Sequence, residues 1–289
     1  PSYESFISQY RTYENNPQKA IIHFEEKLKD FFKVNYVCTF SNCFTSISLA
    51  LKFAIRNRNK TIAIAALSYR RTTDIVLWAG LNPVYIDNDN HTLAMCLNDL
   101  EHKLKSLKIG CVLFQHPMVN IVNPNEVIDI CNKYNVPVIF DSVEATGSEY
   151  NNQKIGSFGM IEAFSLHPSK VINGAEGGVL TFKDNNTYNL FCEYMRKIGV
   201  FDEVFNFGSM FSLEPIHAIL AIESLQSYKE ITRIHKSHYE TYLLHLKKNE
   251  NIKLIEYDKV NKSNFKSILV KLKNNKNIIR NELLNYLEK

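Results

Sequence analysis

The sequence predicts an α/β fold in which a mostly parallel sheet lies between helices, and two observations support this prediction. Short apolar runs rich in β-branched residues alternate with segments of helical periodicity from about residue 18 to residue 141. This alternation is typical of βαβ units, in which a helix connects two parallel strands. A chain of 289 residues, 45% of them hydrophobic, can also bury a large core, in one large domain or two smaller ones.

The alternation begins with a predicted helix over residues 18–32, where Ile21, Phe24 and Leu28 share one apolar stripe. The apolar runs predict strands at 36–40, 61–67, 83–87, 111–116 and 136–141. The segments between these runs predict helices at 45–55, 72–80, 97–107 and 124–134. Gly80 and Pro83 mark one return from helix to strand.

After Asp141 the predicted strands lie closer together, which favours a locally antiparallel portion of the same sheet. The pattern then becomes helical over 217–228 and 238–248, followed by predicted strands at 251–257 and 265–273 and a helix at 278–289. We therefore predict two domains. Residues 1–225 form a large domain, and residues 226–289 form part of a small C-terminal α/β domain.

Composition excludes several classes of function. The net charge is only +4, from 34 basic and 30 acidic residues, and no compact basic and aromatic cluster indicates nucleic-acid binding. No apolar stretch is long enough to span a membrane, and no signal peptide is evident. The six cysteines form no CxxC pair, so we expect free thiols in the cytoplasm and no metal site; they are Cys38, Cys43, Cys96, Cys111, Cys131 and Cys192.

Asp141 and Lys170 are the most informative pair of residues. We predict that each ends an apolar strand-like run, "VPVIFD" for Asp141 and "GMIEAFSLHPSK" for Lys170, and the segment between them can hold a hairpin and one more strand. An acid can keep a ring nitrogen protonated, and a lysine with poor access to water can form a Schiff base with an aldehyde. These are the two groups that a pyridoxal 5'-phosphate (PLP) site requires, so the pair favours a PLP enzyme.

Four blocks around this pair resemble the DegT/DnrJ/EryC1/StrS family of PLP-dependent nucleotide-sugar aminotransferases. They read "DSVEA" from Asp141, "GSFGM" from Gly156, "FSLHPSK" up to Lys170 and "AEGG" from Ala175, in the order and spacing of the family. The best-matched part is residues 24–225. The resemblance implies the type I PLP aminotransferase fold, with the large domain and the small domain described above, which the family continues beyond the equivalent of residue 289.

The resemblance implies a role for each polar residue in these blocks. Lys170 would hold the cofactor covalently, and Asp141 would pair with the ring nitrogen. Glu144 matches the position near the phenolic oxygen, with an ordinary surface glutamate as the alternative, and Ser165 matches the serine that donates to the phosphate. His167 would face the same side as Ser165 if the strand continued, and would steer Lys170 or contact substrate; a structural histidine is equally compatible with the pattern.

The turn "FSNCFTSISLAL" resembles the family's phosphate-binding turn at a helix N-terminus. Cys43 and Phe44 stand where the family has Gly and Thr, so the backbone donors remain and the Thr hydroxyl is lost. Thr45 or Ser46 could supply a substitute hydroxyl.

Tyr69 matches the aromatic residue that stacks on the cofactor ring in the family, with a core aromatic as the alternative. Arg70 and Arg71 follow it, and the sequence does not decide between substrate contact and plain surface. In "NFGSMFSLEPIHA", Met210 aligns with the family's Asn that reaches the partner's cofactor phosphate, and Ser212 aligns with a basic residue. Both polar groups are therefore absent here.

By resemblance, we expect PLP-dependent transamination of a nucleotide-linked keto-sugar, with glutamate as amino donor, in a homodimer. Two alternatives remain open. A PLP-dependent sugar dehydratase is disfavoured because those family members replace this lysine with histidine. A non-catalytic or truncated homologue is compatible with the changed phosphate contacts and the short C-terminal part.

Overall fold

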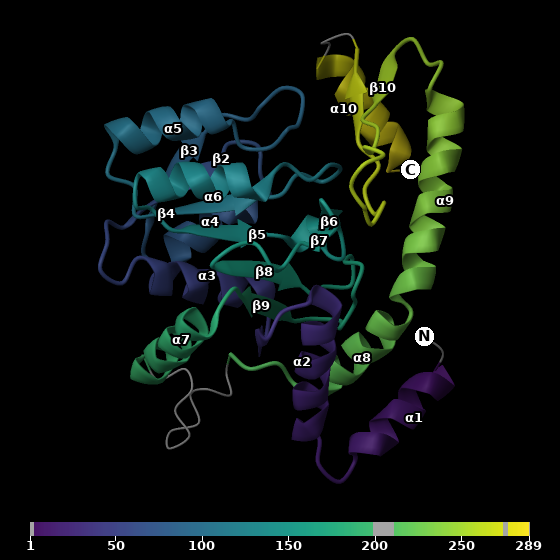
Figure 1. Cartoon of the computed structure of the whole chain (residues 1–289). Helices are drawn as coiled ribbons and strands as arrows, with labels where there is room; N and C mark the ends of the chain where they lie inside the picture. The colour runs from purple at the N-terminus through teal and green to yellow at the C-terminus, as the bar shows by residue number, and fades with distance from the viewer. Residues whose placement is uncertain (1–2, 199–210, 274–276, 289) are drawn as a thin grey trace.

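A central sheet forms the middle of the molecule, and helices cover both of its faces (Figure 1). The computed structural model describes residues 3–198, 211–273 and 277–288. Within these residues the sheet has seven strands, in the order β1 (Tyr36–Phe40), β9 (Gly178–Phe182), β8 (Ile161–Ser165), β5 (Val138–Asp141), β4 (Cys111–Gln115), β2 (Thr61–Ala65) and β3 (Asn82–Ile86). Pairing from β8 to β3 is parallel, and β9 is antiparallel to both of its neighbours. The predicted α/β fold with a mostly parallel sheet is confirmed.

Alternate residues of each strand pack into different cores, because successive side chains of a strand point to opposite faces. Ile64 and Leu113 belong to the core shared with α3 (Cys43–Ala54), α4 (Arg71–Trp78) and α7 (Asn185–Lys197). On the opposite face, side chains such as Phe114 pack with α5 (Leu97–Ser106) and α6 (Pro124–Lys133), and Phe164 packs with α2 (Gln18–Phe32) and α8 (Pro215–Gln226). The strands are therefore apolar on both sides, as expected for a parallel sheet between helix layers.

Local sequence explains where the helices begin and end. In α2, Phe24, Leu28 and Phe32 are buried at intervals of four residues and form the stripe that faces the core. That helix stops at Lys33, whose backbone is left-handed with φ 59°. The α3 helix starts after Asn42, whose side-chain oxygen accepts a hydrogen bond from the Thr45 N–H at 2.8 Å.

The carboxyl ends of the parallel strands meet at one edge of the sheet, which we call the carboxyl edge. The strands that run in this direction end there at Phe40, Ala65, Ile86, Gln115, Asp141 and Ser165. Strand β9 runs the other way and begins there at Gly178, which pairs with both Phe40 and Ser165. Open parallel sheets bind ligands at this edge, so the fold brings the candidate residues to the expected place.

The chain after α8 forms α9 (Tyr228–Leu246), β10 (Ile252–Leu254), β11 (Val270–Leu272) and α10 (Asn277–Leu287). Its own small core contains Tyr239, Leu254 and Tyr257, together with Val119 from the loop after β4. The two predicted strands at 251–257 and 265–273 are correct in place and too long, because only three residues of each are paired.

Three elements differ from the sequence-based expectation. Helix α1 (Tyr3–Tyr13) was not predicted and packs against α8. The expected hairpin after Asp141 is present as β6 (Glu149–Tyr150) and β7 (Gln153–Lys154), but it forms a separate two-stranded sheet, preceded by the short 3-10 helix η1 (Val143–Ala145). Strand β8 is parallel to β5, so the antiparallel portion of the main sheet is due to β9 alone.

Among the helices that the structure describes, none combines the length and the apolar character needed to cross a bilayer. The same residues contain no group of three or more His, Cys, Asp or Glu side chains arranged to hold a metal ion.

Candidate active site

Lys170 lies in a turn at the carboxyl edge, five residues after the last residue of β8. The strand ends at Ser165, and the Lys170 N–H donates to the His167 carbonyl at 2.8 Å. The prediction that Lys170 ends a strand is therefore wrong, because the chain turns after Leu166. The Lys170 Nζ lies 2.6 Å from Glu144 Oε1, and the two side chains are 18% and 10% exposed. This half-buried amine has an anionic partner that is itself shielded from water.

Asp141 ends β5 and is buried next to this ion pair. Its Oδ1 accepts a hydrogen bond from the Val143 N–H at 3.3 Å. Burial raises the pKa of Asp141 to about 6, although the Val143 N–H and the charge of Lys170 act in the opposite direction. Among the described residues Asp141 has no ion pair, so this carboxylate lacks a cation in direct contact.

Glu162, on the neighbouring strand β8, is a buried carboxylate whose two oxygens each accept two hydrogen bonds. Its Oε2 accepts from Ser142 Oγ and from the Gly156 N–H, both at 2.8 Å. Its Oε1 accepts from the N–H groups of Phe158 and Gly159, at 2.7 and 3.0 Å. Four donors therefore fix the "GSFGM" turn and the start of the "DSVEA" block against β8.

The N-terminus of α3 faces the same region. A Cβ at Gly178 would lie 2.5 Å from the Asn42 carbonyl oxygen and 2.8 Å from the Cys43 Cα, so the "AEGG" block packs directly on this turn. Burial raises the pKa of the Cys43 thiol; the charge of Asp141 adds to this effect and that of Lys170 opposes it. Cys43, Asp141 and Lys170 are therefore close enough to interact electrostatically.

Neither Phe44 nor Ser46 offers a free hydroxyl group to an anion at this turn. The Phe44 ring packs edge-on against Trp78, with ring centroids 5.8 Å apart. The Ser46 hydroxyl is buried and donates to the Cys43 carbonyl at 2.9 Å, so Ser46 does not supply the substitute hydroxyl. Of the two expected substitutes, Thr45 remains.

Ser165 and His167 do not share one side of a strand. Ser165 is buried, and its Oγ accepts a hydrogen bond from the His167 N–H at 3.2 Å. The imidazole of His167 is exposed and its Nδ1 lies 3.0 Å from Ser169 Oγ. The expectation that the two side chains face the same way required the strand to continue to His167, and this condition is not met because β8 ends at Ser165.

Tyr69 lies in the loop between β2 and α4 and is 55% exposed, which excludes the alternative of a core aromatic. Its N–H donates to Gln115 Oε1 at 3.2 Å, and Gln115 ends β4 at the carboxyl edge. Arg70 and Arg71 are exposed beside it.

Of the two positions after α7 that we aligned with the family, the structure describes Ser212. Met210 lies outside the described residues. The Ser41 N–H donates to the Phe211 carbonyl at 2.7 Å, so the chain next to Ser212 runs along the α3 turn of its own subunit.

Sequence reasoning did not identify two residues that border the site. Lys266, in the segment after β10, lies with its Nζ 2.6 Å from Glu144 Oε2. His116 follows β4 and is buried with its ring stacked on Phe140 at a centroid distance of 5.2 Å; burial lowers its pKa to about 3. Neither ring nitrogen of His116 has a partner among the described residues. The available signal was its place at the end of the apolar run 111–116, comparable to that of Asp141 at the end of 136–141.

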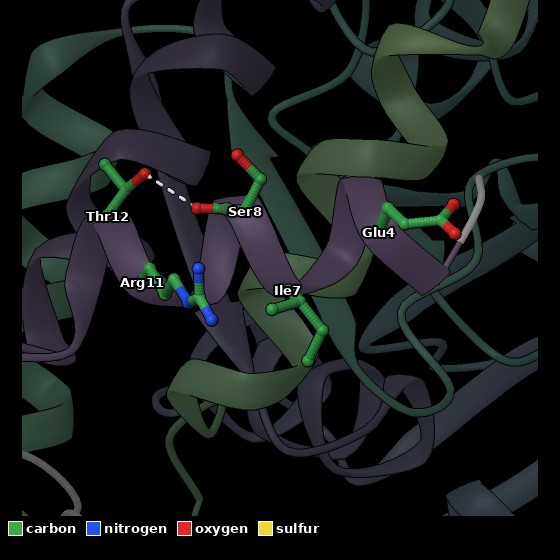
Figure 2. A pocket seen from close by; sticks show the side chains of 5 residues that line it. All are labelled: Glu4, Ile7, Ser8, Arg11 and Thr12. Atoms are coloured by element: carbon green, nitrogen blue, oxygen red, sulfur yellow. Dashed lines mark hydrogen bonds between the residues drawn. The ribbon is translucent and has the colours of Figure 1, made fainter.

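A pocket of 540 Å³ lies elsewhere, along α1 (Figure 2). Its lining side chains all come from this helix; they are Glu4, Ile7, Ser8, Arg11 and Thr12. The Thr12 hydroxyl donates to the Ser8 carbonyl of the same helix at 3.1 Å. None of the five is buried or belongs to the candidate site, so we assign this pocket no chemistry.

Comparison with known proteins gives a consistent result. The chain is 31% identical to the GDP-perosamine synthase of Escherichia coli O157:H7 over 169 residues, which are 57% of this chain and 45% of that enzyme. It is 26% identical to the UDP-4-amino-4,6-dideoxy-N-acetyl-beta-L-altrosamine transaminase of Campylobacter jejuni over 239 residues, 77% of this chain and 62% of that enzyme. The chain thus spans about half the length of these curated relatives.

A solved structure shares the fold over the full length of the chain. The GDP-4-keto-6-deoxy-D-mannose-3-dehydratase of E. coli, solved with bound hydrated PLP, matches with a TM-score of 0.81 at 18% identity, covering 100% of this chain and 82% of that one. The family model of the DegT/DnrJ/EryC1/StrS aminotransferases matches residues 11–289. The chain belongs to the DegT/DnrJ/EryC1/StrS aminotransferase family.

Proposed function

We propose that this protein is a PLP-dependent aminotransferase that acts on a nucleotide-linked keto-sugar. The observation that carries the proposal is the half-buried Lys170, 2.6 Å from Glu144, beside the buried Asp141 at the carboxyl edge of the sheet. In this arrangement the amine would react with the aldehyde of a pyridine aldehyde, and the acid would pair with its ring nitrogen.

The residues present fit PLP. Asp141 is a buried carboxylate without a cation in direct contact among the described residues, and a protonated ring nitrogen would supply that cation. The N-terminus of α3, beside Cys43 and Phe44, offers backbone donors for a phosphate. The buried Ser165 would contribute a hydroxyl, and the exposed Tyr69 a flat ring.

When bound, PLP supplies an electron sink for the bond that breaks at the substrate carbon. Lys170 would hold the cofactor, release it to the incoming amine, and then move one proton from the α carbon of the amino donor to the carbon that carried the cofactor's aldehyde. Asp141 would keep the ring nitrogen protonated throughout. Glu144 would orient the amine of Lys170 while that amine is charged.

The names of the relatives support the substrate class. GDP-perosamine synthase and the altrosamine transaminase are named for amino sugars carried on a nucleotide, so we propose a keto-sugar nucleotide as acceptor and glutamate as donor. A structural neighbour is a sugar dehydratase. Lys170 favours transamination over that reaction, because dehydratases of this family carry histidine at the matching position.

Three further parts of the proposal concern organisation. We propose a homodimer with the sites at the subunit interface, and a location in the cytoplasm. We also propose the division into a large unit, residues 1–225, and a small unit, residues 226–289. The core around Tyr239, Leu254 and Tyr257 supports this division, although Val119 of the large unit also belongs to it. Light scattering tests the dimer: a monomer near 33.4 kDa that retains PLP fully would contradict a shared site.

Reductive trapping tests the central claim. Incubation with PLP followed by borohydride and peptide mass mapping should label Lys170, and Lys170→Ala should lose both the label and transamination. Lys262→Met is the matched control, because Lys262 is 57% exposed and pairs only at the surface with Glu149. Label on another lysine in the unaltered protein would refute the assignment.

A further inference from the structure

Lys170 shares its anionic partner with a second lysine from the C-terminal part of the chain. The Nζ of Lys170 lies 2.6 Å from Glu144 Oε1, and the Nζ of Lys266 lies 2.6 Å from Glu144 Oε2. The side chains of the two lysines are each 18% exposed, and that of Glu144 is 10% exposed. One carboxylate therefore balances two ammonium groups, and the cluster of three carries one excess positive charge.

We propose that Lys266 is a positioning residue of the active site, which keeps the Glu144 carboxylate charged and in place when Lys170 leaves the ion pair. This inference rests on the proposed function, in which the ammonium of Lys170 would first lose one proton to solvent, and the neutral amine would then condense with the cofactor aldehyde to form a C=N bond, with release of water. Without Lys266, Glu144 would then be a mostly buried carboxylate with no cation, which is a costly state. With Lys266, the carboxylate keeps one partner at hydrogen-bond distance.

The segment that carries Lys266 is fixed to the large unit by contacts that do not depend on its charge. Asn264 is 2% exposed, and its Nδ2 donates to the carbonyl oxygens of Glu144 and Thr146, at 2.9 and 3.1 Å. The Lys266 N–H donates to Asn264 Oδ1 at 3.0 Å. The Asn264 side chain therefore connects the backbone at Glu144 and Thr146 with the backbone at Lys266. The Lys266 ammonium can thus be removed while these hydrogen bonds keep the segment in place.

The charge balance around Glu144 favours its ionised form. Burial alone would raise the pKa of Glu144, but Lys266 and Lys170 outweigh burial and hold this pKa below its usual range. Among the described residues, the other titratable groups that face the cluster come from four elements; they are Asp141 at the end of β5, Cys43 at the start of α3, Tyr257 after β10 and His235 on α9. A group with a depressed pKa stays charged until the pH falls through that value, so loss of Lys266 should bring protonation at a higher pH.

The first test follows Glu144 directly, in protein without cofactor. Glutamate labelled at the side-chain carboxyl carbon gives an NMR titration, in which Glu144→Gln identifies the Glu144 resonance. Lys266→Met keeps the apolar stem and removes the charge, and it should raise the titration midpoint by roughly one to three pH units, since an opposite charge within about 6 Å lowers a carboxyl pKa by about that much. Lys266→Arg should restore the midpoint, and Lys262→Met, on the same segment, should leave it unchanged.

The second test asks whether this charge matters for the reaction. In the loaded enzyme, the acid limb of the activity profile should move to higher pH in Lys266→Met and return in Lys266→Arg. An unchanged NMR midpoint in Lys266→Met overturns the proposal, and so does a shifted midpoint with an unshifted acid limb. Failure of Lys170 to take the borohydride label is a separate result: it overturns the proposed function and the active-site role of Lys266, while the NMR shift would still be observed.

Discussion

Asp141 and Glu162 are buried carboxylates on neighbouring strands, and they differ in how many donors surround them. In the ladder between β5 and β8, Phe140 pairs with Glu162 and Asp141 pairs with Ala163. Burial raises the pKa of both groups. Among the described residues, Glu162 nevertheless accepts from four donors at 2.7 to 3.0 Å, whereas the Asp141 side chain accepts from one backbone N–H at 3.3 Å.

Under the proposed function, this difference separates a structural acid, Glu162, from Asp141, the acid that we propose faces the cofactor. A protein that buries a carboxylate normally surrounds it with donors, because an unpaired charge in the interior is unfavourable. Glu162 follows this rule and holds a turn. Asp141 departs from it at the carboxyl edge of the sheet, where a cationic ligand group would complete its partners.

The largest expected effect is on activity, through Asp141. Asp141→Asn keeps the shape and one acceptor oxygen but removes the charge, so we expect transamination to fall by about 10³-fold, as for the loss of a preorganised electrostatic partner. The measurement is kcat/KM at saturating PLP. The control is Glu162→Gln assayed at a temperature where it is folded. Equal losses in the two variants would contradict the distinction between the two acids.

The second effect is on folding, through Glu162. Glu162→Ala leaves the Ser142 hydroxyl and the N–H groups of Gly156, Phe158 and Gly159 without their acceptor in a closed site. We expect the free energy of unfolding to fall by about 3 kcal/mol or more, since each buried donor left unpaired costs about 1–3 kcal/mol before relaxation. Urea denaturation monitored by circular dichroism measures this loss. A change below about 1 kcal/mol would show that water replaces the carboxylate at this turn.

Sequence reasoning predicted the sheet correctly and singled out Asp141 as a candidate residue, both for a physical reason. Apolar runs such as 136–141 are continuous because both faces of the strand are buried, and the polar residue that ends such a run stands out. Asp141 was found in this way. The same pattern placed Lys170 wrongly at a strand end, because the hydrogen bonds that turn the chain after Leu166 leave no signature in hydrophobicity.

Other features depend on contacts between distant parts of the chain. Lys266 reaches Glu144 across 122 residues, and no local pattern distinguishes it from neighbouring surface lysines. Helix α1 has only a weak apolar stripe, and it is held against α8 partly by a hydrogen bond from Ser5 to Glu223. The four donors of Glu162 are likewise invisible in the sequence, because three of them are backbone groups of a turn.

A third prediction concerns the stability of the cofactor-free protein. The pKa of Asp141 is raised to about 6 in the folded state, so its contribution to stability is present below the unfolded value near 4 and is lost as the pH rises through about 6. Asp141→Asn should therefore stabilise the cofactor-free protein by about 3 kcal/mol at pH 8, and hardly at all at pH 4. Thermal unfolding at the two pH values measures the difference.

Adding PLP should make the unaltered protein more stable than Asp141→Asn at pH 8, which reverses the order expected without cofactor. The unaltered protein gains stability because Asp141 then faces a cation, and Asp141→Asn gains much less. A cofactor-free Asp141→Asn protein that is less stable than the unaltered one at pH 8 would mean that Asp141 is already well paired.

The smallest expected effect comes from Ser142, the residue that connects the two acids. Its hydroxyl is buried and donates to Glu162 Oε2 at 2.8 Å, directly after Asp141 in the chain. Ser142→Ala removes one of four donors and leaves three backbone N–H groups on the carboxylate, so unfolding should become easier by about 1 kcal/mol. The same urea denaturation serves as the measurement, and Ser157→Ala, at a serine of the same turn that donates to the Lys154 carbonyl, is the control. If the free energy of unfolding fell as much as in Glu162→Ala, the Ser142 hydroxyl would account for most of the stabilisation. The four donors to Glu162 would then not contribute comparably.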